Sequence, residues 1–353
     1  MEGLINYVTL NLFQGLLRKK DAEINSEAFL KAKINRNQLK NSARPSGKVK
    51  DFFISLRNIF SIVLLLSIIT LTANAQIEEN QALFIQDSLK LVSSQFKFTE
   101  GPAVDKKGNI FFTDQPNNTI WKYDIKGKLS LFTAKAGRAN GLFFDKKGNL
   151  IACADEQFEL WSFDKNAVAT IIYKNPKGAD LNGPNDLWID KKGGTYFTDP
   201  YYQRDYWTRK APAIIGEKVY YLPKESSSII AVDDSLQRPN GIVGSLDGKT
   251  LYVTDAKANK TYRYDIKSDG SLTNRKLFVS QGSDGMTLDN QGNLYLTRKG
   301  VTIYNSKGEQ IGHINVPENH TANLCFGGKN RDVLFITASK SIYTIKMKVK
   351  GVE

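Results

Sequence analysis

The chain has 353 residues, of which 41% are hydrophobic and 24% charged, a composition typical of a globular protein that can bury a sizeable core. Its formal net charge is +13, from 49 Lys and Arg against 36 Asp and Glu. The basic side chains are spread along the chain as pairs in expected turns, such as Lys106-Lys107 and Lys146-Lys147, and form no continuous stripe. This distribution is typical of a solvated surface, so we expect no nucleic-acid partner.

The first predicted element is an uncharged apolar run at residues 59–72, preceded by basic residues and followed by small residues up to Ala75. This pattern is typical of a signal peptide, which we place at residues 51–75 with cleavage near Ala75. A permanent membrane anchor is the competing interpretation, but a span needs roughly 20 apolar residues and this run is shorter. We therefore expect an exported protein, periplasmic or extracellular, with no stable membrane anchor after cleavage.

Residues 1–50 are polar and basic, carry no repeat or motif, and precede a signal peptide of a kind that normally begins near the start codon. We interpret them as a leader of unclear role or as the result of a mis-called start. Removing residues 1–75 takes away 11 Lys and Arg and 5 Asp and Glu, which leaves a net charge of +7. Part of the basic excess therefore belongs to the leader.

From residue 96 onward a unit recurs that reads apolar residue, Asp, polar pair, Gly and alternating strand, and six copies are visible. In such a turn Asp bonds its own downstream backbone and Gly supplies a positive φ. The first five turn glycines are separated by 40, 45, 55 and 44 residues, and a period of about 40 to 50 residues with several short strands is typical of propeller blades. The sequence predicts an all-β fold, a six-bladed β-propeller at residues 83–349. The turn glycines are Gly108, Gly148, Gly193, Gly248 and Gly292.

The longest of these intervals predicts an insertion in the fourth unit, at residues 200–216. We interpret the insertion as a loop over one face of the propeller. Its aromatic side chains, Tyr201, Tyr202, Tyr206 and Trp207, have two possible roles. They either wall a substrate pocket or cover a hydrophobic edge of a blade, and the sequence does not decide between the two.

Every unit also carries a carboxylate or an amide side chain just upstream of its turn. A propeller brings equivalent loops to one end of its central channel, so these side chains are predicted to converge although they are far apart in the sequence. Taken singly, Asn-Gly or Asp-Gly is more often a turn than a ligand, but turn chemistry does not explain Glu in the first unit and Asp in the fifth. Two carboxylates with several amides form an all-oxygen site that suits Ca²⁺, Mg²⁺ or Mn²⁺. The residues are Glu100, Asn140, Asn185 with Asp186, Asn240, Asp284 and Asn323.

Five short stretches around these residues resemble a known family in order and in spacing. Over residues 90–345 the chain is similar to the gluconolactonase, senescence marker protein (regucalcin) and luciferin-regenerating enzyme family. Each stretch is weak alone, and the resemblance rests on the ensemble. The stretches are Glu100-Gly101-Pro102, Gly183-Pro184-Asn185-Asp186, Pro239-Asn240-Gly241, Asp284-Gly285-Met286 and Asn323-Leu324-Cys325-Phe326-Gly327-Gly328.

The resemblance implies a calcium-type propeller that holds one divalent cation, Ca²⁺ first, with Mg²⁺ or Mn²⁺ as alternatives. The implied metal ligands match Glu100, Asn240 and Asp284, with Asn185 close to the metal. The implied substrate contacts match Asn140, Asn185 and Asp186. Asp284 is also the implied catalytic acid and base. Animal members carry Arg at the position of Gly183, so their substrate preference is not carried over.

The expected function is metal-dependent opening of a sugar lactone, in which the cation polarises the carbonyl and Asp284 moves the proton. Two alternatives stay open: another esterase or an organophosphate hydrolase on the same propeller, and a non-catalytic propeller that uses the metal to bind a carbohydrate or a protein partner. The sequence contains no Gly-x-Ser-x-Gly, His-Glu-x-x-His or P-loop motif. Its two histidines are too few for a His-based metal site. His320 precedes the polar residue of the sixth unit and either lines the pocket or lies on a surface loop, and we expect the surface loop. The oligomeric state is left open.

Overall fold

The computed structural model describes residues 58–59, 61–71, 73–74, 87–174 and 181–352. The chain divides into two compact units, Met1–Thr70 and Leu71–Glu353. The described part of the first unit is helical, with exposed side chains. Within the described residues, no helix combines the length and the apolar character needed to cross a membrane. Residues 1–50 and the cleavage site near Ala75 lie outside the described residues, so the signal peptide stays a prediction.

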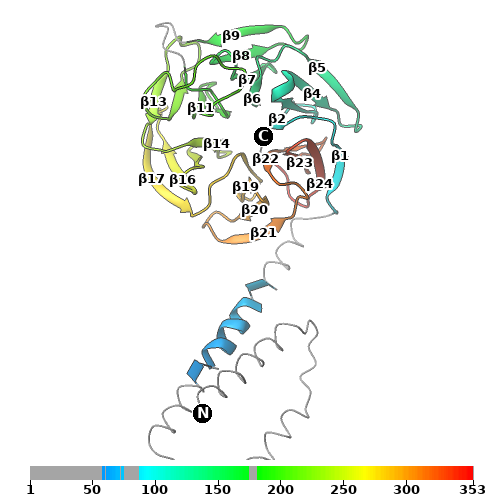
Figure 1. Cartoon of the computed structure of the whole chain (residues 1–353), viewed down its shortest axis with the longest axis vertical. Helices are drawn as coiled ribbons and strands as arrows, with labels where there is room; N and C mark the ends of the chain where they lie inside the picture. Colours follow the sequence, from blue (N-terminus) through cyan, green and yellow to red (C-terminus); the bar gives the residue numbers. More distant parts are fainter. Residues whose placement is uncertain (1–57, 60, 72, 75–86, 175–180, 353) are drawn as a thin grey trace, which may run out of the picture. The chain divides into compact units, whose positions relative to one another are not determined.

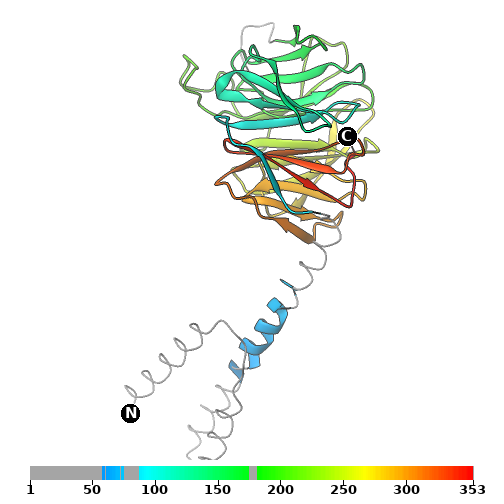
Figure 2. The same ribbon diagram turned by 90° about the vertical axis from the view of Figure 1, so that its right-hand side faces the viewer.

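The second unit contains six four-stranded antiparallel sheets arranged around a central axis (Figure 1). The predicted all-β, six-bladed propeller is therefore confirmed. Five blades use four consecutive strands, from the innermost strand at the axis to the outermost at the periphery. The sixth blade closes the ring because β1 and β24, the first and last strands of the described residues, pair with each other. Figure 2, turned by 90°, shows the strands running roughly along the propeller axis.

The first blade contains β2 (Thr99–Val104), β3 (Ile110–Asp114), β4 (Thr119–Tyr123) and β5 (Leu129–Thr133), with the 3₁₀ helix η2 (Gln115–Asn117) after β3. The second and third contain β6 (Ala139–Phe144), β7 (Leu150–Ala154), β8 (Glu159–Phe163), β9 (Ala169–Tyr173), β10 (Leu187–Ile189), β11 (Thr195–Asp199), β12 (Lys218–Leu222) and β13 (Ile230–Asp233). The fourth and fifth contain β14 (Pro239–Gly244), β15 (Thr250–Asp255), β16 (Lys260–Ile266), β17 (Leu272–Val279), β18 (Met286–Leu288), β19 (Leu294–Arg298), β20 (Gly300–Tyr304) and β21 (Gln310–Ile314). The sixth contains β22 (Thr321–Gly327), β23 (Val333–Ala338), β24 (Ser341–Lys346) and β1 (Lys90–Ser93).

The repeated turn joins the innermost strand of a blade to its second strand. In the first blade, Oδ1 of Asp105 accepts the backbone N–H groups of Lys107 at 2.8 Å and Asn109 at 2.9 Å. Gly108 adopts φ +93° and donates its N–H to the carbonyl of Asp105 at 2.9 Å. The Asp and Gly of the motif thus have separate roles, a side-chain acceptor and a positive φ, which is why both recur with fixed spacing.

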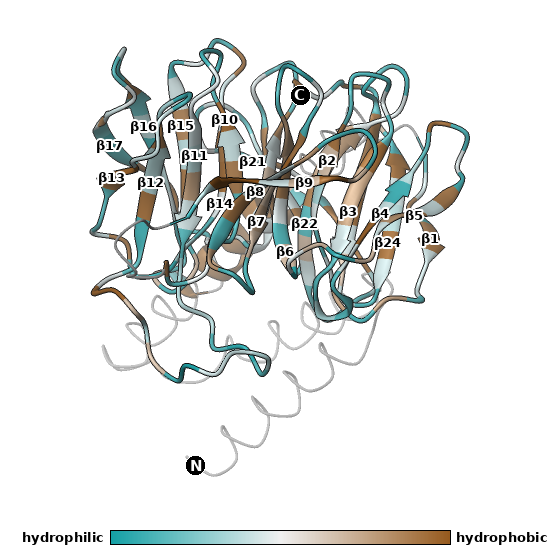
Figure 3. Cartoon of the chain, turned by 90° about the horizontal axis from the view of Figure 1, so that it is seen from above, coloured by the Kyte–Doolittle hydropathy of each residue, from teal (hydrophilic) through white to brown (hydrophobic). Residues whose placement is uncertain are grey.

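The core lies between neighbouring sheets. Successive side chains of a strand point to opposite faces, and in a propeller both faces of a blade are covered. On β11, Tyr196 belongs to a core cluster with Val243 and Tyr252 of the fourth blade, whereas Phe197 belongs to a cluster with Ile151 of the second. This explains why the inner strands are apolar at consecutive positions. Figure 3 shows hydrophobic stretches within the strands and mostly hydrophilic turns at their ends.

The insertion connects β11 to β12 and so belongs to the third blade. The expectation that it lies in the fourth unit was wrong. The expectation treats the turn glycines as boundaries between units. Gly193 instead lies inside the third blade, where it joins the innermost strand to the second strand. The insertion follows the second strand of the third blade, so it belongs to the same blade as the turn at Gly193.

Candidate active site

A pocket with a volume of about 340 Å³ opens at one end of the central channel. Five of the six blades place a predicted site residue in its lining, namely Glu100, Asn140, Asn185, Asn240 and Asp284. These five residues, far apart in the sequence, therefore lie together in one pocket, as expected from their place in the repeat. The remaining lining residues are Phe98, Tyr202, Arg204, Ala256, Gly282, Ser283, Arg298 and His320.

A recurrent aspartate at the end of the second strand holds the segment that leads into the site. Asp199, at the end of β11, accepts the backbone N–H groups of Asn182 at 2.9 Å and Gly183 at 2.8 Å, one on each carboxylate oxygen. These two residues immediately precede Pro184 and Asn185, so the clamp sets where Asn185 enters the pocket. Asp255 likewise accepts the backbone N–H groups of residues 237–238, one on each oxygen, just before Asn240. Asp114 accepts those of residues 97–98, both on Oδ1, just before Glu100.

Glycine follows four of the site residues because neighbouring innermost strands approach closely around the channel. A Cβ atom at Gly241 would lie 2.5 Å from the carbonyl oxygen of Asp284 in the next blade, closer than side chains tolerate. A Cβ at Gly101 would lie 2.1 Å from the carbonyl oxygen of Asn140. The Asn-Gly and Asp-Gly pairs therefore act as close-approach points between blades. The four glycines are Gly101, Gly141, Gly241 and Gly285.

β-Bulges turn three of the site side chains toward the channel. The pairing of β2 with β3 shifts between Glu100 and Ala103, and that of β14 with β15 shifts between Pro239 and Ile242. The pairing of β6 with β7 shifts in the same way on either side of Asn140. A bulge adds a residue to one strand and re-aims the side chains beside it. The site residues are thus presented by a local irregularity that repeats at the same place in three blades.

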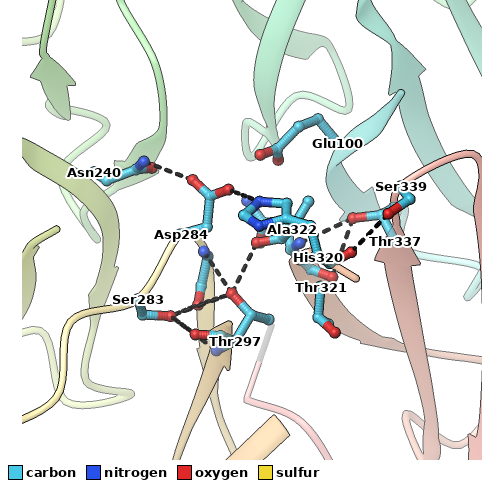
Figure 4. Close-up of polar contacts among 12 residues, drawn as sticks. Glu100, Asn240, Ser283, Asp284, Thr297, His320, Thr321, Ala322, Thr337 and Ser339 are labelled. Carbon is cyan, nitrogen blue, oxygen red and sulfur yellow. Dashed lines mark hydrogen bonds and ion pairs between the residues drawn. The ribbon is translucent and has the colours of Figure 1, made fainter. Parts of the chain in front are cut away.

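Asp284 is the centre of the polar contacts in the pocket (Figure 4). Its Oδ1 accepts a hydrogen bond from Nδ2 of Asn240 at 2.5 Å, and its Oδ2 lies 2.6 Å from Nε2 of His320. The His320 ring stacks on Phe98 with ring centroids 5.9 Å apart. The hydrogen bond to the Asp284 carboxylate raises the pKa of His320 above its usual value, against the opposing effect of burial. The preferred expectation of a surface-loop role for His320 was wrong, and the alternative, a place in the pocket lining, is what the structure has.

Glu100 is a nearly fully buried carboxylate, with 3% of its surface exposed. Its Oε2 accepts the N–H of Gly101 at 2.7 Å. Burial, followed by the nearby carboxylate of Asp284, raises the pKa of Glu100 well above its usual range. Two carboxylates thus converge where ionising both is costly, and a cation between them would remove this cost.

The donor chemistry of the pocket fits a hard divalent cation. Glu100 and Asp284 supply carboxylate oxygens, and Asn185 and Asn240 supply amide oxygens, the ligand types that Ca²⁺ prefers. Among the described residues, no cluster of three or more His, Cys, Asp or Glu side chains is arranged to hold a metal. The pocket offers a cation amide oxygens as well as carboxylate oxygens.

Asp186 lies outside the pocket lining. Its Oδ1 accepts the N–H of Leu187 at 2.9 Å, and its Oδ2 accepts a hydrogen bond from Nδ2 of Asn323 at 3.3 Å. Adjacent residues of an extended chain point to opposite sides, so Asn185 faces the pocket while Asp186 supports it from behind. The prediction that Asp186 contacts substrate gains no support from this placement, and Asn323 likewise acts behind the lining.

The insertion contributes to the pocket and also packs on the second blade. Tyr202 lines the pocket, and its hydroxyl accepts a hydrogen bond from Nδ2 of Asn240 at 3.1 Å. Burial raises the pKa of Tyr202 to about 12, so this side chain stays neutral. Trp207 is instead buried against Phe158, with ring centroids 4.9 Å apart. The sequence left two roles open for these aromatic side chains. Tyr202 walls the pocket, and Trp207 covers a hydrophobic edge of a blade.

Asp155 anchors the insertion to the second blade. Its Oδ2 lies 3.2 Å from Nε of Arg204 and also accepts the hydroxyl hydrogen of Tyr206, while its carbonyl accepts the indole N–H of Trp207 at 3.3 Å. Asp155 is 2% exposed. It therefore fixes Arg204 in the pocket lining, a role that the sequence did not indicate.

The fold and the site together define a six-bladed propeller with an oxygen-donor pocket at the end of its channel. Residues 98–340 match the family model described as SMP-30/Gluconolactonase/LRE-like region. The chain belongs to this family.

Known relatives agree with this assignment. A gluconolactonase from Zymomonas mobilis is 29% identical over 303 residues, which cover 76% of this chain and 84% of that protein. The structure of a gluconolactonase from Xanthomonas campestris is 26% identical, with a TM-score of 0.71, and the match covers 75% of this chain and 92% of that chain. The structure of a calcium-binding protein, regucalcin, from Agrobacterium tumefaciens is 19% identical, with a TM-score of 0.64 over 75% of this chain and 95% of that chain, and shares the fold.

Proposed function

We propose that this protein hydrolyses a sugar lactone in the pocket, with one divalent cation held by Glu100, Asn240 and Asp284 and with Asn185 beside it. The observation that carries the proposal is the convergence of two carboxylates and several amides from five blades in one pocket. The similarity to gluconolactonases along most of the chain supports lactones as the substrate class. Ca²⁺ is the ion to test first because the donors are all oxygen and the set includes amides.

The bound cation would supply Lewis-acid stabilisation of the oxyanion that forms on the lactone carbonyl. Asp284 takes a proton from the attacking water at a carboxylate oxygen and returns it to the ring oxygen that leaves as an alkoxide. Asn240 and His320 contact one oxygen each of this carboxylate and thereby fix its orientation. Asn140 and Asn185 present amides that can hydrogen-bond the sugar hydroxyls and hold the ring over Asp284.

The lining favours a polar ring over an aryl ester. Of the aromatic side chains in the insertion, Tyr202 lines the pocket, whereas Trp207 is engaged elsewhere. Phe98 is covered by the imidazole of His320. The described lining contains the rings of Phe98, Tyr202 and His320, but its carboxylate, amide and guanidinium groups outnumber these rings. A non-catalytic binding propeller remains the rival from another class, and turnover separates the two.

The test is hydrolysis of D-glucono-1,5-lactone in a pH-stat, corrected for spontaneous opening. Asp284→Asn keeps the size of the side chain and removes the proton acceptor, and we expect a loss of about 100-fold or more in kcat. Asp234→Asn is the matched control, since Asp234 is exposed and outside the lining. Wild-type protein that binds the metal but turns over no aldonolactone or aryl ester would eliminate the enzyme and leave the binding propeller.

We also propose that the protein is exported and cleaved near Ala75. The proposal rests on the uncharged run at residues 59–72 and the small residues after it. The measurement is the N-terminal sequence of the protein recovered from the periplasm or medium of the producing cells, which is expected to begin at Gln76. Recovery of the intact N-terminus from the cytoplasm would contradict it.

A further inference from the structure

Arg298 is a positive charge at the pocket that the proposed mechanism does not use. It ends β19 and lines the pocket together with Asp284 and His320. Its Nη1 donates a hydrogen bond to the side-chain oxygen of Asn259. Among the ion pairs of the described residues, none involves Arg298. The guanidinium therefore keeps its charge and further N–H donors at the pocket.

The position of Arg298 in the repeat shows that it does not have the role of its counterparts. The second strand of the first, third and fourth blades ends in Thr-Asp, and the aspartate clamps the entering backbone. The fifth blade carries Thr297-Arg298 instead. There Ser283 Oγ accepts the N–H of Thr297 at 2.8 Å, and Thr297 Oγ1 accepts the N–H of Gly285 at 2.9 Å. The local backbone is thus held without residue 298. Arg298 places a positive charge in the pocket lining, whereas the equivalent aspartates of the other blades are buried outside it.

The remaining charged groups of the lining have partners, and His320, which contacts Asp284, adds positive charge when it is protonated. Arg204 is paired with Asp155, which lies 3.2 Å from its Nε. Glu100 and Asp284 together balance the divalent cation of the proposed function, on which this inference rests. With the cation bound, the positive charge of Arg298 has no negative side chain of the lining left to balance it. A site with this charge distribution favours a ligand that carries a negative charge away from the reacting carbonyl.

We propose that the physiological substrate is a lactone with an anionic substituent, a carboxylate or a phosphate, and that Arg298 binds this substituent. A guanidinium pairs with two oxygens of either group at once, which gives direction as well as attraction. Arg204, whose charge is already paired, donates hydrogen bonds to neutral parts of the sugar. Arg298 is thus a specificity-determining residue, and it takes no part in moving the proton.

The experiment compares matched pairs of lactones on the full protein loaded with Ca²⁺. The phosphate arm sets 6-phospho-D-glucono-1,5-lactone against D-glucono-1,5-lactone, and the carboxylate arm sets D-glucaro-1,4-lactone against D-glucono-1,4-lactone. Each pair is measured with wild type, Arg298→Gln and Arg298→Lys. Lys299→Gln is the matched control, because Lys299 is the next residue, is exposed and lies outside the lining.

We expect wild type to favour at least one acidic lactone over its neutral partner by about tenfold or more in kcat/KM, as one charge-assisted hydrogen-bonded pair provides. Arg298→Gln lowers the preference because it raises KM for the acidic lactone more than for the neutral one. Arg298→Lys keeps part of the preference, and Lys299→Gln leaves it unchanged. The arm that shows the preference identifies the anionic group. A second readout without turnover is the rise in Tm that D-glucarate gives beyond D-gluconate, which Arg298→Gln abolishes.

Two failures are distinguishable. If wild type hydrolyses neutral and acidic lactones equally and Arg298→Gln changes neither KM, the inference about Arg298 is overturned and the lactonase stands. If wild type hydrolyses no lactone, the proposed function fails. In that case the Tm measurement still decides whether Arg298 binds an anionic sugar acid: an equal Tm rise with D-glucarate in wild type and Arg298→Gln rejects it.

Discussion

Gly241→Ala tests whether the glycine after each site residue is required by the close approach of neighbouring blades. A Cβ atom at this position would lie 2.5 Å from the carbonyl oxygen of Asp284 and 3.1 Å from Cα of Gly285. Both are backbone atoms of the next innermost segment, so no side-chain rotation relieves the overlap. The two blades must move apart at the point where Asn240 meets Asp284.

The expected magnitude follows from this geometry. Overpacking in a tight core costs about 1 to 3 kcal/mol, and a clash between backbones falls at the upper end, about 3 kcal/mol. For a domain of this size a loss of 1 kcal/mol lowers Tm by roughly 2 to 4 °C, so Gly241→Ala is expected to lower Tm by roughly 6 to 12 °C. The variant should also bind the cation more weakly and have a lower kcat, because the substitution would strain the contact between Asn240 and Asp284.

The assay is thermal unfolding followed by circular dichroism, with two alanine variants as controls. Gly292→Ala creates conformational strain alone, since φ is +80° and a Cβ there meets no atom within 4 Å; about 1 to 2 kcal/mol is expected. Gly101→Ala combines a φ of +38° with a Cβ 2.1 Å from the carbonyl oxygen of Asn140 and should be the most damaging. A Gly241→Ala protein no less stable than wild type would refute the close-approach explanation.

Three further predictions concern the clamp, the cation and the insertion. Burial raises the pKa of Asp199 to about 7, so the folded state holds a proton that the unfolded state releases at lower pH. The free energy of unfolding should therefore fall by up to about 1.4 kcal/mol per pH unit as pH rises from about 4 to 7. Urea titrations of Asp199→Asn should lack this slope. Ca²⁺ at a hundred times its Kd should stabilise wild type by about 2.7 kcal/mol in thermal unfolding, and Asp284→Ala should not respond. Asp155→Ala removes the partner of Arg204 and Tyr206, so trypsin should cut within residues 200–217 faster than in wild type, and equal rates would exclude Asp155 as the anchor.

The fold could be predicted because each blade repeats a local device. Asp105 and Gly108 form the turn through contacts within five residues, so their spacing is visible in the sequence. The closure of the ring by β1 and β24 was not predicted, since that pairing joins segments about 250 residues apart and leaves no local pattern. The blade assignment of the insertion failed for a related reason, because the turn glycine lies between the first and second strands of a blade and not at its boundary.

The site was predictable where its residues share one phase of the repeat. Glu100, Asn240 and Asp284 follow this rule and lie in the pocket. Asp186 is one residue out of phase and faces away. Arg298 was missed because an Arg at the end of a strand carries no local signal of its own. It becomes visible only when the strand ends of several blades are compared and Arg is found where three other blades have Asp.

His320 shows a different limit. Its contact with Asp284 crosses 36 residues and depends on how the loop before β22 folds back over Phe98. The one available signal was its position three residues before Asn323, the polar residue of the sixth unit. A residue at that offset reaches the channel in this fold, but the offset has meaning only once the blade geometry is known.

Removal and return of the cation test the central claim most directly. The measurement is the rate of D-glucono-1,5-lactone hydrolysis by wild-type protein before EDTA, after EDTA and dialysis, and after addition of Ca²⁺, Mg²⁺ or Mn²⁺. We predict that chelation abolishes the enzymatic rate and that at least one of these ions restores it. A full rate in the metal-free protein would contradict the role assigned to Glu100, Asn240 and Asp284.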